Sequence, residues 1–230
     1  MTDSERNKLE ERLGYHFMDK TLLMRALTHS SYMNEQKNNK LQDYERLEFL
    51  GDAVLEMVSS AFLYSRYPER SEGELSKTRA SLVCEQALSG VARSLGLSDY
   101  LILGHGEDMG GGRNKPSILC DVTEALIGAM YLDSGEDVNV PKQFIIREIL
   151  SDIEDKQLFY DAKSILQEYV AKDGKVLSYR LISEDGPSHE RVYHMEVLIG
   201  EQPVADGTGH SKKAAEQEAA YEALKKTYLR

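Results

Sequence analysis

Hydrophobic residues follow two different periods, which divide the chain near residue 160. Before that point they recur at four-residue spacing, as in Leu9, Leu13 and Phe17, a pattern typical of amphipathic helices. Between residues 193 and 199, apolar and polar residues alternate, as expected of a half-buried strand. The pattern therefore predicts a multidomain protein, with an all-α domain followed by a small α+β domain.

Helices separated by polar or glycine-rich loops are expected over the first part. The predicted helices span residues 9–17, 19–27, 41–64, 71–95, 117–132 and 141–155. Asp19 is placed to cap the second helix, and Ser71 and Glu74 have the spacing of a capping box. Residues 34–39 and 104–115 are predicted loops, the second one flexible, and no strand pair is expected before residue 160.

The segment from residue 161 to residue 230, called the tail below, is predicted to have the element order α-β-β-β-α. Its helices are expected over residues 161–172 and 211–228, and its strands over 176–183, 193–199 and 202–207. Both helices should cover one face of a small antiparallel sheet. A short flexible linker at 156–160 would then separate a domain at 1–155 from a domain at 161–230.

Composition and charge narrow the class of protein. The 230 residues carry a net charge of −11, and 27 of the 39 acidic residues lie within residues 1–160. This balance argues at first against a nucleic-acid partner, because phosphate binding usually leaves a basic footprint. Two cysteines, Cys84 and Cys120, are too few for a disulfide framework. With no signal-peptide pattern and no apolar run long enough for a bilayer span, a cytoplasmic protein without a membrane partner is expected.

Acidic residues share one face of the predicted helix at 41–64. Glu45, Glu48 and Asp52 stand at positions i, i+3 and i+7, whereas Leu47 and Val54 lie on the opposite face, which should be the core. Like charges at this spacing repel each other. A purely structural helix would normally place a basic residue among them, and no basic residue falls on that face.

A second helix repeats this arrangement. Asp121 and Glu124 are i and i+3 within a segment that is otherwise almost entirely apolar. A single acidic pair is usually a solvated surface, but ionised carboxylates in a buried helix are costly unless something compensates them. The simplest compensation for several facing carboxylates is a divalent cation with oxygen ligands, and Mg²⁺ keeps coordination sites for a phosphate substrate. Glu48, Asp52, Asp121 and Glu124 are therefore a candidate metal site.

Phe49 lies beside the carboxylate face and away from the core face. The pattern leaves two alternatives open. The ring is either covered by the loop at 34–39 or buried against a second chain.

These residues carry a resemblance to a known family. The octapeptide ERLEFLGD at 45–52 resembles the signature of the ribonuclease III family. Three further segments resemble family elements in the same order: LTHSSY at 27–32, EGELS at 72–76, and SILCDVTEALIG at 117–128. The match therefore extends across most of the first 130 residues.

The resemblance implies roles for individual residues. The family's metal-binding quartet falls on Glu48, Asp52, Asp121 and Glu124, with Asp52 and Glu124 expected to be catalytic. The family's supporting acidic positions fall on Glu45 and Glu72. The family is a homodimer in which the aromatic residue at the position of Phe49 packs into the partner subunit.

The tail has its own candidate contacts with RNA. His189 lies in a predicted turn, and residues 207–209 contain two glycines that would let backbone approach a phosphate. Ser211 is placed to cap the last helix, where Lys212 and Lys213 and the helix N-terminus attract phosphate. Each feature alone is weak evidence for RNA binding, since a pair of lysines usually just faces solvent.

Together their order and spacing resemble the double-stranded RNA-binding domain, which spans about 16 base pairs. The resemblance places Gln167 and Glu168 at its first minor-groove contact and His189 at its second. It places Lys212 and Lys213 on the major-groove phosphates. Ala171 departs from members that have a polar residue there.

The sequence thus predicts a bacterial-type double-strand-specific endoribonuclease that uses Mg²⁺, with Mn²⁺ able to replace it. Mg²⁺ held by the quartet would activate a water for phosphodiester hydrolysis. The family's products carry 5′-phosphate and 3′-hydroxyl ends with short 3′ overhangs, and its targets include ribosomal RNA precursors and messages. Two alternatives are a non-catalytic double-stranded RNA-binding protein and a metal-dependent phosphohydrolase acting on nucleotides.

Overall fold

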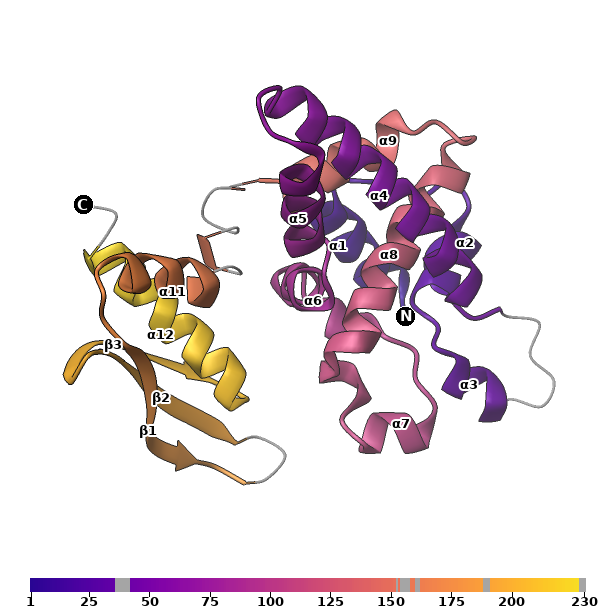
Figure 1. Cartoon of the computed structure of the whole chain (residues 1–230). Coiled ribbons are helices and arrows are strands. Elements are labelled where there is room, and N and C mark those ends of the chain that lie inside the picture. Colours follow the sequence, from indigo (N-terminus) through magenta and orange to yellow (C-terminus); the bar gives the residue numbers. More distant parts are fainter. Residues whose placement is uncertain (36–41, 152, 154–157, 160–161, 188–190, 228–230) are drawn as a thin grey trace. The chain divides into compact units, whose positions relative to one another are not determined.

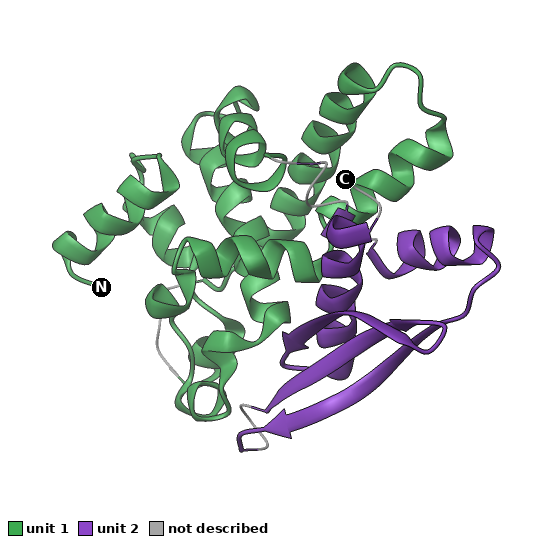
Figure 2. Cartoon of the chain, turned by 90° about the vertical axis from the view of Figure 1, so that its left-hand side faces the viewer, with its two compact units in different colours: residues 1–151 green, residues 152–230 purple. Residues whose placement is uncertain are grey.

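The chain divides into two units in the computed structural model, residues 1–151 and residues 152–230 (Figures 1 and 2). The structure describes residues 1–35, 42–151, 153, 158–159, 162–187 and 191–227. The linker predicted at 156–160 lies mostly outside these residues, so the predicted domain limits remain a prediction.

The first unit is helical, as predicted. Its elements are α1 (Asp3–Leu13), α2 (Lys20–Ala26), α3 (Ser30–Glu35), α4 (Glu45–Arg66), α5 (Glu72–Leu82), α6 (Glu85–Ser94), η1 (Leu97–Tyr100), α7 (His105–Met109), η2 (Gly112–Asn114), α8 (Pro116–Asp133), α9 (Asn139–Phe144) and η3 (Ile145–Ile149). Within its described residues, β-type pairing is confined to a single bridge between Thr28 and Ile102.

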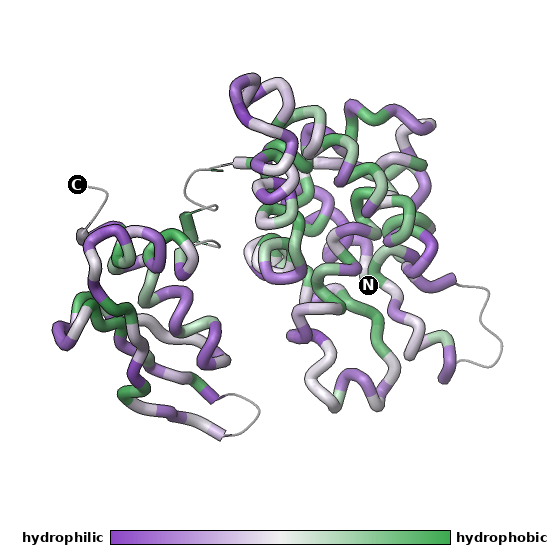
Figure 3. The backbone as a smooth tube through the Cα atoms, in the orientation of Figure 1, coloured by the Kyte–Doolittle hydropathy of each residue, from purple (hydrophilic) through white to green (hydrophobic). Residues whose placement is uncertain are grey.

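Helix α8 forms the centre of this unit and packs against α4, α6 and α2. Its apolar side chains are almost completely buried, among them Leu119, Val122, Leu126 and Met130. The buried residues of α4, such as Leu47, Val54 and Val58, are also mainly apolar, and Figure 3 shows hydrophobic residues concentrated within the helical unit. The acidic residues of α4 and α8 therefore belong to two helices that pack closely against each other.

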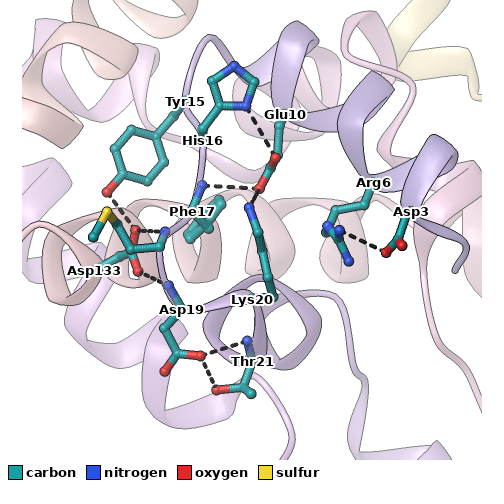
Figure 4. Close-up of polar contacts among 11 residues, drawn as sticks. Asp3, Arg6, Glu10, Tyr15, His16, Phe17, Asp19, Lys20, Thr21 and Asp133 are labelled. Carbon is teal, nitrogen blue, oxygen red and sulfur yellow. Dashed lines mark hydrogen bonds and ion pairs between the residues drawn. The ribbon is translucent and has the colours of Figure 1, made fainter.

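Two carboxylates fasten the segment between α1 and α2 (Figure 4). Glu10, buried at 1% exposure, accepts hydrogen bonds from the backbone N–H of Phe17 and from Nζ of Lys20. Asp133, at the end of α8, accepts from the hydroxyl of Tyr15 at 2.8 Å. It also accepts from the backbone N–H groups of residues 18 and 19. The N-terminal helix is thus tied to the central one.

Three predicted elements differ in the structure. The helix expected at 71–95 is wrong, because an extended residue at Cys84 separates α5, which packs on α4, from α6, which packs on α8. The helix expected at 9–17 ends at Leu13, since Gly14 has the positive φ of a left-handed cap. The loop expected at 104–115 holds α7 and η2, joined by an ion pair between Asp108 and Arg113.

The helices predicted at 19–27, 41–64 and 117–132 are confirmed within a few residues, whereas α3 was not predicted and includes the first two residues of the loop expected at 34–39. The capping box of Ser71 and Glu74 and the cap by Asp19 both form. The helix predicted at 141–155 begins with α9 and continues into the π-helical turn η3, which ends at Ile149 and is followed by a bend at Leu150, before the predicted end. None of the helices in the described ranges has the length and apolarity required to cross a bilayer.

The second unit has the predicted order of elements. It consists of α11 (Ala162–Lys172), β1 (Leu177–Asp185), β2 (Val192–Ile199), β3 (Gln202–Gly209) and α12 (Lys212–Thr227). The strands form an antiparallel sheet in the order β1-β2-β3. Both helices contribute to its core, in which Leu166, Val170, Val197 and Leu224 are buried.

Candidate active site

Two glycines let helices α4 and α8 cross in backbone contact. A Cβ atom added to Gly51 would overlap the carbonyl oxygen of Glu124, and one added to Gly128 would overlap the carbonyl oxygen of Leu47. Side chains at these positions would therefore force the helices apart. The close crossing brings the acidic face of α4 against the two carboxylates of α8.

The four carboxylates of this crossing act on each other electrostatically. Burial raises the pKa of Glu124 to about 8, with further increases from the charges of Asp52, Glu48 and Asp121. Burial also raises the pKa of Glu48, and Asp121 contributes to that shift. The four side chains predicted from the sequence thus form one cluster.

Asp121 is the member of the cluster with the most polar support. Burial raises its pKa, while a hydrogen bond from Tyr44 and the nearby His29 oppose that increase. The hydroxyl of Tyr44 lies 3.1 Å from Oδ2 of Asp121. Among the described residues, no lysine, arginine or histidine forms an ion pair with Asp121 or the three other carboxylates. The excess negative charge is left for a cation to balance.

Cys120 is a further neighbour of the cluster, to which the sequence analysis gave no role at the site. Its Sγ lies 4.0 Å from Oε1 of Glu124, and potential ligand atoms of Cys120, Asp121 and Glu124 all lie within 4.8 Å of each other. Burial raises the pKa of the thiol. A protonated thiol is a poor ligand for a hard cation, so the oxygen atoms remain the suitable donors for Mg²⁺.

The two supporting acidic residues lie differently. Glu45 is exposed at the start of α4, and its charge contributes to the raised pKa of Glu48. Glu72 is exposed at the start of α5, where it accepts a hydrogen bond from the hydroxyl of Ser76. Glu45 therefore joins the cluster, whereas Glu72 is not among the charges that shift the pKa values of Glu48, Asp121 and Glu124.

Phe49 is 80% exposed within the part of the chain that the structure describes. Farther along α4, Met57 and Tyr64 are exposed at 53% and 74%. Residues 36–41 of the loop that could cover Phe49 lie outside the described residues. An apolar surface of α4 is thus open to solvent in the described part of the single chain.

The predicted RNA contacts of the second unit lie on two helices. Gln167 and Glu168 are exposed on α11. Ser211 caps α12 by accepting from the backbone N–H of Ala214 at 3.1 Å, and Lys212 is exposed in its first turn. Lys213 is exposed in the same turn. His189 lies outside the described residues.

The two glycines at 207 and 209, predicted to bring backbone close to a phosphate, have an internal neighbour. Gly207 and Gly209 pack against α12, because a Cβ atom at either position would clash with its backbone. The backbone N–H of Thr208 between them donates to Oε2 of Glu218. The structure therefore gives these glycines a role in internal packing, and the approach of this backbone to a phosphate stays a prediction.

Comparison with known proteins identifies both units. Residues 19–153 match the family model described as ribonuclease-III-like, and residues 162–227 match the double-stranded RNA binding motif. The chain is 47% identical over 222 residues to a Bacillus velezensis protein named ribonuclease 3, covering 95% of this chain and 88% of the relative. The chain belongs to the ribonuclease III family.

Other members of the ribonuclease III family are similarly close. The Enterococcus faecalis ribonuclease 3 is 46% identical over 221 residues, which cover 95% of both chains. The crystal structure of the nuclease domain of Campylobacter jejuni ribonuclease III superposes with a TM-score of 0.57 at 44% identity. It covers 65% of this chain and 95% of that domain. The protein is therefore an endoribonuclease with an attached double-stranded RNA-binding domain.

Proposed function

We propose that the protein hydrolyses phosphodiester bonds of double-stranded RNA in a Mg²⁺-dependent reaction at the α4–α8 crossing. The observation that carries this proposal is the cluster of four carboxylates, two from each helix. Among the described residues, no basic side chain forms an ion pair with any of them. The family match and the RNA-binding motif support the substrate class.

The donor set fits a hard divalent cation. Glu48, Asp52, Asp121 and Glu124 offer only carboxylate oxygens, which suit Mg²⁺ and also Mn²⁺. The repulsion that raises the pKa of Glu124 disappears when a cation neutralises its neighbours. We infer that these four residues hold the metal, and that Asp52 and Glu124 are the catalytic pair among them.

A bound divalent ion supplies Lewis-acid chemistry, stabilising charge on phosphate oxygens and making water a better nucleophile. The four carboxylates would hold such an ion, and Asp52 is exposed, which leaves one side of the cluster open to RNA. The expected products carry 5′-phosphate and 3′-hydroxyl ends.

A homodimer is the proposed active form. The exposed ring of Phe49 and the apolar side chains that follow it on α4 favour burial against a second copy. A groove of about 520 Å³ between α4 and the α9–η3 segment, lined mainly by apolar residues such as Val58 and Ile146, adjoins this surface. Two sites on one duplex would cut both strands and leave short 3′ overhangs.

The second unit is proposed to hold the duplex through Gln167 and Glu168 on α11, His189, and the start of α12 with Ser211, Lys212 and Lys213. Glu45 and Glu72 are proposed to support the site or its RNA. We further propose processing of ribosomal RNA precursors and structured messages in the cytoplasm.

A duplex-cleavage assay with a Glu124→Gln variant tests the function. The wild type should cut long duplex RNA only with Mg²⁺, whereas the variant should bind the duplex normally and leave it intact. Intact duplex with the wild type in both conditions would instead support a non-catalytic RNA-binding protein. Turnover of mononucleotides but not duplex would support a nucleotide phosphohydrolase.

A further inference from the structure

One residue connects both metal-bearing helices. The backbone carbonyl of Tyr44 accepts hydrogen bonds from the backbone N–H groups of Leu47 and Glu48, at 2.7 and 2.9 Å, and so begins α4. Its side-chain hydroxyl reaches α8 and donates to Oδ2 of Asp121 at 3.1 Å. The same residue therefore fixes the start of the helix that carries Glu48 and the orientation of a carboxylate on the other helix.

Tyr44 is itself held from several sides. Its ring is 2% exposed, and the ring of His29 lies against it with centroids 5.7 Å apart. Its backbone N–H donates to the carbonyl of Thr28 at 2.9 Å. The His29 ring is fixed in turn, because its Nδ1 accepts from the backbone N–H of Ser31 at 3.1 Å. The phenol therefore has little freedom to leave Asp121.

We propose that Tyr44 is a positioning residue for the metal site: its hydroxyl holds Asp121 in the orientation that binds Mg²⁺, and His29 holds Tyr44. This inference rests on the proposed function. Hydrogen-bond partners behind a metal ligand commonly change metal affinity by about 10–100-fold when they are removed. Repulsion within the cluster favours rotation of Asp121 away from its neighbours, and the phenol opposes that rotation.

Tyr44→Phe removes the hydroxyl and keeps the buried ring. Binding of Mg²⁺ to the RNA-free protein, measured by titration calorimetry, should weaken at least tenfold. The Mg²⁺ concentration for half-maximal duplex cleavage should rise in parallel, while the maximal rate at saturating Mg²⁺ should stay near the wild-type value. A merely structural role would not produce this shift in the metal requirement.

Tyr15→Phe is the matched control, because the Tyr15 hydroxyl donates to Asp133 at 2.8 Å at the far end of the same helix α8. It removes the same kind of bond and should leave Mg²⁺ binding unchanged. If both variants bind Mg²⁺ like the wild type, or weaken equally, the role of Tyr44 is overturned while the metal site stands. If the wild type neither binds Mg²⁺ nor requires it for cleavage, the proposed function fails and this inference fails with it.

His29→Ala gives the same test without changing Tyr44, in case Tyr44→Phe does not fold. Loss of the ring that packs on Tyr44 should weaken Mg²⁺ binding in the same direction but to a smaller extent. Unchanged Mg²⁺ affinity in folded His29→Ala would also overturn the inference.

Discussion

Gly51 and Glu124 lie in direct backbone contact, since the space for a Cβ on Gly51 is already filled by the carbonyl oxygen of Glu124. This contact sets the separation of α4 and α8 and with it the spacing of the carboxylates. The glycine in the family signature is thus a packing requirement of the site. Its chemical role is indirect, because it only permits the helices to approach.

Gly51→Ala should therefore damage both fold and activity. The added methyl must push the helices apart, which costs about 3 kcal/mol of unfolding free energy. Displacement of the carboxylates should lower the cleavage rate on the order of 100-fold. Urea unfolding and a duplex-cleavage assay measure the two effects.

Gly106→Ala is the control for that substitution. Gly106 lies in helix α7, and apart from its neighbours in the chain and the backbone of its own helix nothing lies within 4 Å of the added Cβ. Stability and cleavage should stay close to the wild type, because alanine has the higher helix propensity. Equal losses in both variants would contradict the packing role of Gly51.

The sequence predicted the parts of the fold that depend on local rules. The capping box at Ser71 and the acidic face of α4 follow from spacing along one helix, and both are confirmed in the structure. The break at Cys84 could not be predicted in this way, because it exists so that α5 and α6 can pack on different helices. The packing role of Gly207 was missed for the same reason, since its neighbour is a helix that follows it in the chain.

The site shows the same division. Spacing identified all four carboxylates, because each pair lies on one helix face. Tyr44 was missed, since its hydrogen bond joins residues 77 positions apart and an aromatic residue before a helix has no distinctive pattern. Its place directly before the signature was the one available signal.

Stability of the metal-free protein should fall as pH rises from about 5 to about 8. Glu124 has a pKa of about 8 in the folded chain, against an ordinary value of 4.5, so the folded state binds its proton more tightly than the unfolded state. The stabilisation is therefore complete below the ordinary pKa and is lost as pH rises through the folded one. Thermal unfolding at a series of pH values without divalent ions measures this dependence.

Glu124→Gln should make that profile less steep, because glutamine does not titrate, and the unfolding temperature of the variant should exceed that of the wild type near pH 8. Mg²⁺ should raise the unfolding temperature of the wild type at high pH, since the cation stabilises the ionised carboxylates of the folded state. Parallel profiles for the wild type and the variant would show that Glu124 is not the titrating group.

Phe49→Ser should dissociate the proposed dimer without unfolding the chain. The ring is 80% exposed in the single chain, so its loss removes few internal contacts. In a two-fold symmetric dimer, the substitution removes one buried ring from each chain. If each ring contributes about 2 kcal/mol to association, the dimer dissociation constant should rise roughly 1000-fold. Analytical ultracentrifugation measures the change, and circular dichroism should retain the helical signal.

Met18→Ser is the matched control, because Met18 is 87% exposed and lies outside α4. The dimer dissociation constant of this variant should equal that of the wild type. A monomeric wild type, or a dimer unaffected by Phe49→Ser, would exclude this surface as the interface.

The start of α12 should supply most of the salt dependence of RNA binding by the second unit. Replacing Lys212 and Lys213 together by alanine removes two predicted phosphate contacts. The slope of log affinity against log salt should therefore decrease by roughly 2, since each lysine on a phosphate contributes about one. Fluorescence anisotropy with a labelled duplex at several salt concentrations measures this slope.

The control is the Lys225/Lys226 double alanine variant, which removes the same charge at the opposite end of α12, where Lys225 pairs with Glu222. Because that end has no predicted phosphate contact, its slope should match the wild type, and equal slopes in the two variants would mean that net charge alone attracts the RNA.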